Sequence, residues 1–361
     1  MAGGRGRRWA WPVVVAVGVT GLGFLPPVQA RGKAAAVLAE AVGLSFPRPF
    51  APAVGRQDAT LDGVTGHLYV PDRRSPAILL VLGAAPRGKD DPRAARLARS
   101  LARAGRVVFV PDLILAERRF DREDLDRIAR SVVALDEHPS TRGPVVVLGI
   151  SYGGSLALMA STDPRTRGRL AQMAVFGAYW DLIGVIQAMT TGVSIVGGEA
   201  VPWEGHPLSR EVFEQYAIDL APADARADLR AALAGGGDPA ALPPEARALH
   251  DLLANRDPAL VDDLAARLGQ DARAVLEGFS PSSVTDAIEV PVVAMHSTDD
   301  PAVPYGEALR LTEALPGTRL ITVRLFRHVD FRTQGPGGWA SALADLWDAW
   351  RFASFILDPQ E

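Results

Sequence analysis

A serine lies in the middle of a glycine-rich hexapeptide, Gly149–Gly154, and its surroundings could make it a nucleophile. An apolar run precedes it, as in a buried strand, and a helix-forming run follows. A strand that turns into a helix within so few residues brings two backbones together, so Gly149 and Gly153 must lack side chains. The N–H groups of the new helix would face negative charge developing near Ser151. Because 35 glycines make a chance match easy, the flanking strand and helix support the motif. They predict a G-x-S-x-G nucleophile elbow rather than a plain tight turn.

A serine hydroxyl needs a base within hydrogen-bond reach, and the base needs a carboxylate that orients it. Of the six histidines, His328 is the one that lies late in the chain and directly after a predicted strand, Leu320–Leu325. The carboxyl end of that strand should face the same edge of the sheet as the serine. We therefore predict that His328 is the base. The alternative is a histidine in a surface loop.

The orienting carboxylate is expected after the preceding strand, where Asp299 and Asp300 are adjacent. Side chains of adjacent residues in an extended loop point apart, so only one of the two can meet the imidazole. Asp181, which follows an earlier strand, is the fallback. Asp330 is too near His328 in sequence to reach its ring easily. His296 opens the loop of the two aspartates and is interpreted as structural.

Strand patterns alternate with helical patterns along most of the chain, and one long stretch, residues 183–285, interrupts them with helical patterns alone. Alternation of this kind predicts an α/β fold with a mostly parallel, doubly wound sheet and helices on both faces. Ligands of such sheets bind at the carboxyl ends of the strands, where the elbow lies. The last helix, Gly338–Leu357, is expected to pack its apolar side chains inward: Trp339, Leu343, Leu346, Trp347 and Trp350. The predicted organisation is a targeting segment (1–30), a linker with a short helix (31–55), a first core part (56–182), a helical insertion (183–285) and a second core part (286–361).

The serine elbow, the Asp-x-x-Val-Pro turn at Asp300–Pro304 and the late His328 follow one another in the chain order Ser, Asp, His. In this the sequence resembles the α/β-hydrolase superfamily over residues 56–358, apart from the insertion. The closest subgroup in appearance is that of dienelactone-hydrolase-like and acyl-peptidase-like serine hydrolases, in which Tyr frequently follows the serine, as Tyr152 does here. The resemblance implies the α/β-hydrolase fold and favours Asp300 over Asp299 as the acid, because this turn usually takes the Asp-x-x-Val-Pro form.

The chain departs from the superfamily's pattern at the oxyanion loop. Many members have His-Gly after the first long strand, whereas this chain has Leu-Gly-Ala-Ala-Pro at residues 82–86. The oxyanion hole is therefore placed by position, with the backbone N–H groups of Tyr152 and Ala84 as the expected donors. The insertion would form a helical cap over the active site, or else a passenger domain packed elsewhere.

These features predict a serine hydrolase that cleaves a carboxylic ester through an acyl-enzyme on Ser151, acting on a small-molecule acyl substrate. An acyltransferase and a small-peptide or amide hydrolase are alternatives on the same fold. A non-catalytic envelope binding protein is an alternative of another class. We expect no metal and no organic cofactor, since no cluster of ligand residues suggests one.

Composition and the N-terminal sequence indicate the expected partners and cellular location of the protein. The net charge is −4 and no basic block occurs beyond the extreme N-terminus, so nucleic acid is not an expected partner. Cysteine is absent, which excludes disulfides and thiolate metal sites. Arginines at positions 5, 7 and 8 precede the apolar run Trp9–Leu25, and Ala30 follows shortly after. This pattern is typical of a secretory signal peptide or an uncleaved membrane anchor, and both remain open. Either predicts an extracytoplasmic protein, because the arginines stay inside.

Overall fold

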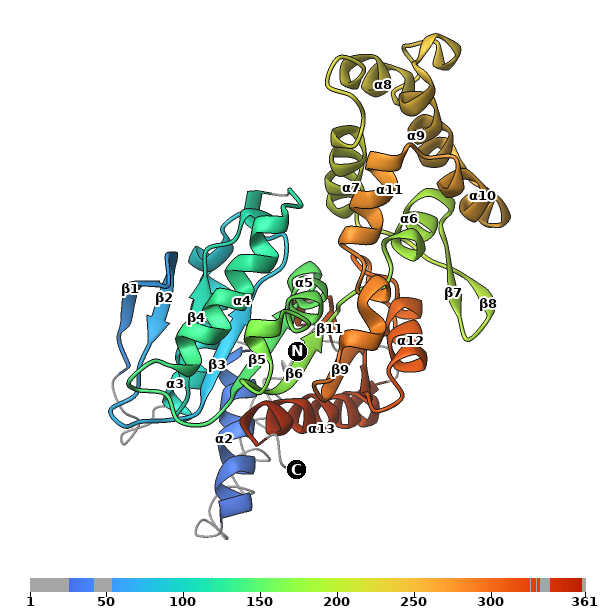
Figure 1. Cartoon of the computed structure of the whole chain (residues 1–361). Helices are drawn as coiled ribbons and strands as arrows, with labels where there is room; N and C mark the ends of the chain where they lie inside the picture. The colour runs from blue at the N-terminus through green and yellow to red at the C-terminus, as the bar shows by residue number, and fades with distance from the viewer. Residues whose placement is uncertain are drawn as a thin grey trace, which may run out of the picture.

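An eight-stranded sheet forms the centre of the computed structural model, which describes residues 26–41, 54–117, 119–324, 326–328, 330–331 and 338–358. Its strand order is β1-β2-β4-β3-β5-β6-β9-β10 (Figure 1). The pairs β1·β2 and β2·β4 are antiparallel and all the other pairs are parallel. The strands are β1 (Arg56–Leu61), β2 (Val64–Tyr69), β3 (Ala77–Val81), β4 (Val107–Pro111), β5 (Val145–Ile150), β6 (Leu170–Phe176), β9 (Val292–Ser297) and β10 (Arg319–Val323). The predicted α/β class and mostly parallel sheet are confirmed.

Helices cover both faces of the sheet, which is why its central strands are apolar throughout. All five residues of β3 are buried, and successive side chains enter opposite cores. Leu79 packs in one core with α4 (Arg122–Asp136) and α5 (Tyr152–Ala160). Leu80 packs in the other core with residues of three further helices, α2 (Pro26–Ala41), α3 (Pro92–Arg103) and α13 (Gly338–Leu357). Helix α12 (Tyr305–Ala314) lies beside β9 and β10.

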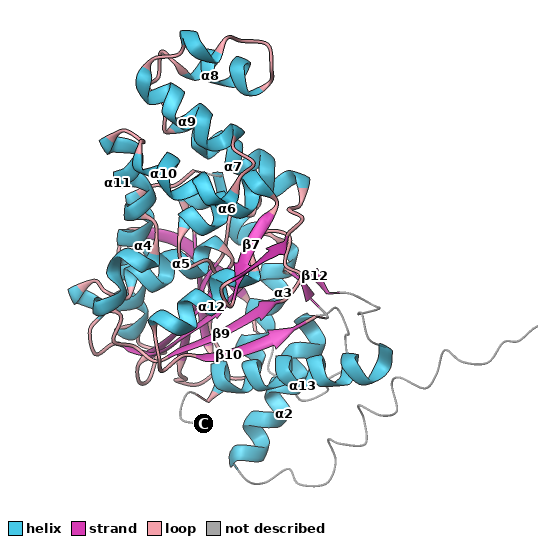
Figure 2. Ribbon diagram, turned by 90° about the vertical axis from the view of Figure 1, so that its right-hand side faces the viewer, coloured by secondary structure: helices cyan, strands magenta, loops and turns pink. Residues whose placement is uncertain are grey.

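The insertion between β6 and β9 stands on the other side of the sheet from α2 and α13 (Figures 1 and 2). Its helices are α6 (Leu182–Thr191), α7 (Pro207–Asp219), α8 (Arg226–Leu233), α9 (Pro244–Ala254), α10 (Val261–Ala266) and α11 (Gln270–Gly278). The expectation that it contains no strand is wrong, since β7 (Val193–Val196) pairs with β8 (Glu199–Pro202). The turn of this hairpin is Gly197–Gly198, and both glycines have positive φ, the turn type that two-residue hairpins favour.

Helix α13 has the predicted bounds, but part of its predicted inward face is wrong. Leu343 is 45% exposed and Trp347 is 59% exposed. The inward position one turn earlier than Ala349 belongs to Asp345, which is buried because its carboxylate accepts the backbone N–H of Arg324 at 2.9 Å. The exposed pair lies on the opposite side of the helix. Leu346 and Trp350 are partly buried against the core, and the side chain of Trp339 lies outside the described residues.

Helix α2 begins at Pro26, within the predicted targeting segment, and continues to Ala41 in the predicted linker, so it is longer than the short helix expected there. Residues 42–53 lie outside the described part. So does the apolar run Trp9–Leu25 of the predicted targeting segment. Within the described ranges, no helix combines the length and the apolar character needed to cross a bilayer.

Candidate active site

Ser151 sits between β5 and α5 in a backbone conformation that is rare for a residue with a side chain, φ 55° and ψ −138°. Its N–H donates to the Phe176 carbonyl of the neighbouring strand at 2.7 Å. The adjacent glycines are needed sterically. A Cβ on Gly149 would collide with Gly154, and one on Gly153 would collide with the Leu82 carbonyl. The elbow therefore packs against its own helix on one side and against the end of β3 on the other.

His328 and Asp300 form a hydrogen-bonded pair at the same edge of the sheet. The His328 Nδ1–H donates to Asp300 Oδ2 at 2.8 Å. The other carboxylate oxygen of Asp300 accepts the N–H groups of Ala302 and Val303, at 2.8 and 3.0 Å. Both oxygens of this buried carboxylate are thus held, and one of them is directed at the imidazole.

Gly177 connects this pair to the serine. It follows Phe176, the residue that accepts the Ser151 N–H, and a Cβ on it would stand 3.1 Å from His328 Nδ1 and 3.3 Å from Asp300 Oδ2. Gly177, just after the carboxyl end of β6, therefore adjoins the Asp300–His328 pair and directly follows the residue that accepts the Ser151 N–H. Sequence analysis did not single out Gly177, whose position directly after a strand in the middle of the sheet was the available signal.

The nucleophile elbow, the sheet order and the sequence of Ser151, Asp300 and His328 along the chain together decide the architecture. The chain has the α/β-hydrolase fold. The insertion after β6 is helical with one added hairpin, and it is referred to below as the cap.

Solved structures of similar backbone course include an α/β-hydrolase, GrgF, from Penicillium sp. sh18, with 15% identity, a TM-score of 0.47 and coverage of 84% of this chain and 99% of that one. Est1E from Butyrivibrio proteoclasticus matches at 16% identity and a TM-score of 0.46, covering 84% and 98% of the two chains. The dienelactone hydrolase of Anabaena variabilis matches at 14% identity and a TM-score of 0.42, covering 83% and 97%. No protein-family model matches this chain, and no curated protein matches it.

Two of the three non-glycine residues with positive φ in the described part are Ser151 and His328, which has φ 58°. The third, Asp62, lies in the β1–β2 turn. Left-handed backbone at residues with side chains is costly and persists where the surroundings hold it in place. In this α/β-hydrolase fold it is found at the two residues that the predicted proton transfer would link.

Asp299, the alternative acid, is exposed, and its carboxylate accepts from Ser297 Oγ at 2.8 Å. Asp181, the fallback, caps α6 by accepting the Ile183 N–H at 2.7 Å, and it also accepts from Ser282 Oγ at 2.6 Å. Neither carboxylate has a contact with the imidazole. The side chain of Asp330 lies outside the described residues. The geometry therefore leaves Asp300 as the partner of His328.

His296 is buried beneath Asp300 and donates from Nε2 to the Val303 carbonyl at 3.0 Å. Burial lowers the pKa of His296, although the nearby Asp300 acts to raise it. Burial by itself would raise the pKa of Asp300. The positive charge and hydrogen bond of His328, with smaller effects from His296 and the Val303 N–H, hold it below the usual value. The carboxylate is thus kept ionised in a dry setting, as an imidazole partner requires.

The loop after β3 approaches the serine closely. A Cβ on Gly83 would stand 2.7 Å from Ser151 Cβ and 3.2 Å from its Oγ. Ala84, the expected oxyanion donor, is the next residue, while the Ala85 N–H is already used by the Gly83 carbonyl at 2.7 Å. On the other side of the serine, the Tyr152 N–H lies at the start of α5. The two expected donors therefore flank Ser151 on separate segments.

The cap contacts the loop that carries Asp300. Trp203 Nε1 donates to the Asp300 carbonyl at 2.7 Å, and the His206 N–H donates to the Pro301 carbonyl at 2.8 Å. Sequence analysis missed both residues, and nothing in their local pattern indicated a partner about a hundred positions away. These contacts tie the position of the acid to the position of the cap.

An apolar cavity of about 610 Å³ lies between the core and the cap. Tyr152 and Phe120 contribute from the core, and Tyr216 and Phe279 from the cap. The rings form one cluster around Phe120, with centroid distances of 4.6 Å to Tyr216, 4.9 Å to Phe279 and 5.8 Å to Tyr152. Tyr152, which directly follows the serine, connects this lining to the elbow, while Ser151, Asp300 and His328 do not line the cavity themselves.

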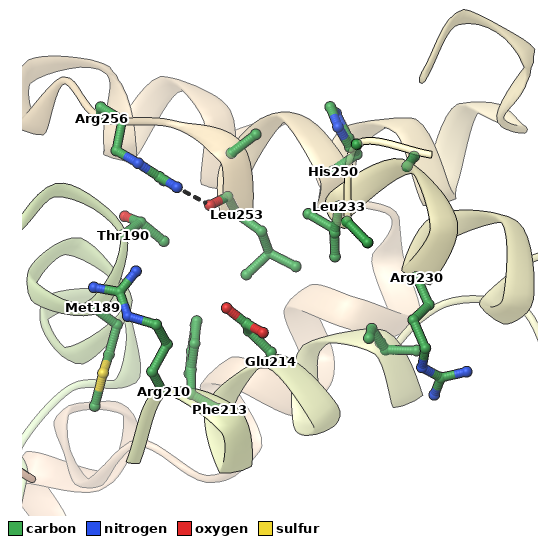
Figure 3. A pocket seen from close by; sticks show the side chains of 15 residues that line it. Met189, Thr190, Arg210, Phe213, Glu214, Arg230, Leu233, His250, Leu253 and Arg256 are labelled. Carbon is green, nitrogen blue, oxygen red and sulfur yellow. Dashed lines mark hydrogen bonds between the residues drawn. The ribbon is translucent and has the colours of Figure 1, made fainter. Parts of the chain in front are cut away.

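A second cavity, of about 320 Å³, lies within the cap and is lined only by its helices (Figure 3). The Glu214 carboxylate and the Arg210 and Arg256 guanidinium groups stand around it. Leu253 and Phe213 line both cavities and so separate them. No residue of the core reaches this second cavity, so we do not assign it to the site around Ser151. In the described part of the chain, no three His, Asp or Glu side chains are grouped as metal ligands would be.

Proposed function

We propose that this chain is a serine hydrolase that cleaves a carboxylic ester through an acyl-enzyme on Ser151. The single observation that supports the proposal most is the contact chain at Gly177, which sets the Asp300–His328 pair beside the strained serine. A hydroxyl, an imidazole and a buried carboxylate in this order are the parts that acyl transfer needs.

In the proposed reaction Ser151 Oγ attacks the acyl carbonyl carbon while its proton passes to His328 Nε2. Asp300 keeps the imidazole in the tautomer that leaves Nε2 free to accept, and it stabilises the imidazolium. The tetrahedral intermediate then breaks the bond to the leaving oxygen, which takes the proton from His328. A water molecule repeats the sequence on the acyl-enzyme and releases the acid. The N–H groups of Tyr152 and Ala84 would hold the oxyanion, and each would lower the activation barrier by about 3 kcal/mol.

The cavity beneath the cap supports an apolar substrate group. Its lining is mainly aromatic and aliphatic, and its volume of about 610 Å³ exceeds what a short acyl chain needs. We propose that this cavity takes the larger apolar part of the ester. Its closure by the cap would also exclude water, so acyl transfer to a hydroxylated acceptor is the second candidate. Product analysis with added alcohols separates transfer from hydrolysis.

The test is covalent labelling with a fluorophosphonate probe followed by peptide mapping. We expect label on Ser151 alone, no label on Ser151→Ala, and loss of p-nitrophenyl ester turnover in that variant by about 10³-fold or more. The matched control is Ser161→Ala at the other end of α5, where the hydroxyl only bonds the Leu158 carbonyl. Full turnover by Ser151→Ala would exclude the proposed mechanism. Absence of label on the wild-type serine would favour a binding protein.

A further inference from the structure

The face of the molecule formed by α2 and α13, on the side away from the cap (Figures 1 and 2), combines exposed apolar side chains with a group of cations. We define this basal face by Leu343 and Trp347 of α13, Lys33 of α2, and Arg73, Arg106 and Arg142 in the segments that enter β3, β4 and β5. Arg73, Arg106 and Arg142 lie before the amino ends of their strands, whereas Leu343 and Trp347 flank Asp345, which accepts the N–H of Arg324 just after the carboxyl end of β10. Figures 1 and 2 show α2 and α13 together on this side and the cap on the other.

Exposed large apolar side chains are few, and two of them are one turn apart on this face. The described part has four, Val201, Leu260, Leu343 and Trp347, of which the first two lie in the cap. Trp347 is the most exposed, and its ring packs against Trp350 at a centroid distance of 4.6 Å. Trp350 Nε1 in turn donates to the Arg31 carbonyl in α2 at 2.9 Å. The apolar patch is therefore continuous with the start of α2.

The cations gather on the other side of α2. Lys33 Nζ reaches the turn before β4, where a Cβ on Gly105 would stand 3.7 Å from it. Burial first, and then the charges of Arg106, Arg142 and Arg73, lower the pKa of Lys33, as expected for a lysine that lies near these three arginines. Asp358 is the carboxylate that acts on Arg106. Among the described residues none of the four cations has an ion pair within 4.0 Å of a carboxylate, and the buried Nε of Arg106 has no hydrogen-bond partner.

The sequence outside the described residues indicates what covers this face. The apolar run Trp9–Leu25 ends immediately before α2 begins at Pro26, so it joins the folded body through the helix that carries Arg31 and Lys33. Tryptophans are enriched at the level of lipid headgroups, and clustered Lys and Arg beside an apolar segment are attracted to anionic lipids. A second copy of the chain would place four unpaired cations against four others, which charge repulsion opposes.

We propose that the basal face rests on an anionic lipid surface, with Leu343 and Trp347 inserted at headgroup level and the four cations against lipid phosphates. The body is then held with its cap directed away from the bilayer (Figures 1 and 2). The contact is made by the folded domain itself and does not depend on the proposed hydrolase reaction.

The absence of cysteine allows a site-specific test in the full-length chain. Leu343→Cys and Leu260→Cys are labelled with an environment-sensitive fluorophore, the second being a matched control in the cap with 46% exposure against 45%. Circular dichroism and the melting temperature verify that both variants fold. On vesicles that contain phosphatidylglycerol we expect a blue shift and quenching by brominated lipid for the label at 343 and neither for the label at 260. The double variant Arg73→Glu, Arg142→Glu should reduce this quenching at equal lipid by about tenfold or more.

Three results would overturn the proposal. One is equal emission of the labels at 343 and 260 on vesicles. Another is quenching at 343 that is unchanged on vesicles of phosphatidylcholine alone, or unchanged in the double variant Arg73→Glu, Arg142→Glu. The last is a blue shift at 343 without vesicles that grows with protein concentration, which would assign the face to a second copy.

Discussion

His328 Nδ1 lies 2.8 Å from Asp300 Oδ2, while the carboxylate of the adjacent Asp299 accepts instead from Ser297 Oγ at 2.8 Å. Two neighbouring aspartates of one loop thus have separate partners. Because only Asp300 orients the imidazole, we expect Asp300→Asn to reduce kcat for p-nitrophenyl esters by about 10³–10⁴-fold through the wrong tautomer of His328.

Asp299→Asn is the matched control, with the same chemical change one position away. It should alter kcat by no more than about threefold, since a solvent-exposed carboxylate is replaced. Steady-state kinetics and thermal melting of both variants make the comparison. If Asp299→Asn loses as much activity as Asp300→Asn, the proposed acid is wrong or the loop acts only as a unit.

The loop after β3 is predicted to position the oxyanion donor at Ala84, and Gly83 is the residue that lets it approach the serine. We expect Gly83→Ala to lower kcat by about 10²-fold, because the new methyl group would stand 2.7 Å from Ser151 Cβ and must displace the loop or the nucleophile. Gly55→Ala is the control, as a Cβ there has no heavy atom within 4 Å. Unchanged kcat with intact fluorophosphonate labelling would show that the loop contributes no donor.

The sheet and the elbow could be predicted from sequence because their signals are local. A buried parallel strand such as β3 needs five apolar residues in a row, and the turn at Ser151 needs glycines at fixed offsets. The same locality explains the failure at α13. The apolar stripe of this helix predicts its inward face, but Asp345 occupies part of that face because its carboxylate accepts the Arg324 N–H. A pattern of apolar residues does not predict a buried carboxylate.

The parts of the site that depend on distant partners could not be predicted. Trp203 and Asp300 meet across 97 positions, and Gly177 touches His328 only because β6 lies between the strands that carry the triad residues. Such contacts follow from the placement of the cap on the core. The choice between Asp299 and Asp300 came from the resemblance of the turn to a known family, and the residues alone left it open.

Glu307 is a buried carboxylate at the junction of core and cap, and it should make the stability of the fold depend on pH. It accepts the N–H groups of Trp180 and Asp181 at 3.1 and 2.7 Å, at the start of the chain's passage into the cap. Burial raises the pKa of Glu307 from 4.5 to about 7, against the opposing charge of Arg310. Between these two values the native state binds the proton and the unfolded chain does not. The free energy of unfolding should therefore fall as pH rises through this window, by up to about 3 kcal/mol.

Glu307→Gln keeps an oxygen for the two N–H groups and removes the titration. We expect its free energy of unfolding, measured by urea at several pH values between about 4.5 and 8, to fall less steeply with pH than that of the wild type. Glu313→Gln, an exposed change on the same helix, should leave the wild-type slope. Equal slopes for all three proteins would show that Glu307 is not the titrating group.

The cavity beneath the cap should set the preferred length of the apolar substrate group, and Val275 on α11 lines it. Replacement of this partly buried side chain by tryptophan, Val275→Trp, adds a ring to a cavity of about 610 Å³ that begins at Tyr152. We expect kcat/KM for p-nitrophenyl decanoate to fall by about tenfold or more while that for the acetate stays within about threefold. Only the decanoyl chain is long enough to need the space that the tryptophan ring occupies. The acetate rate serves as the internal control for folding, together with the melting temperature. An equal loss with both esters, or none with either, would place the acyl chain outside this cavity and would leave the cap as a cover for the site rather than a part of its specificity.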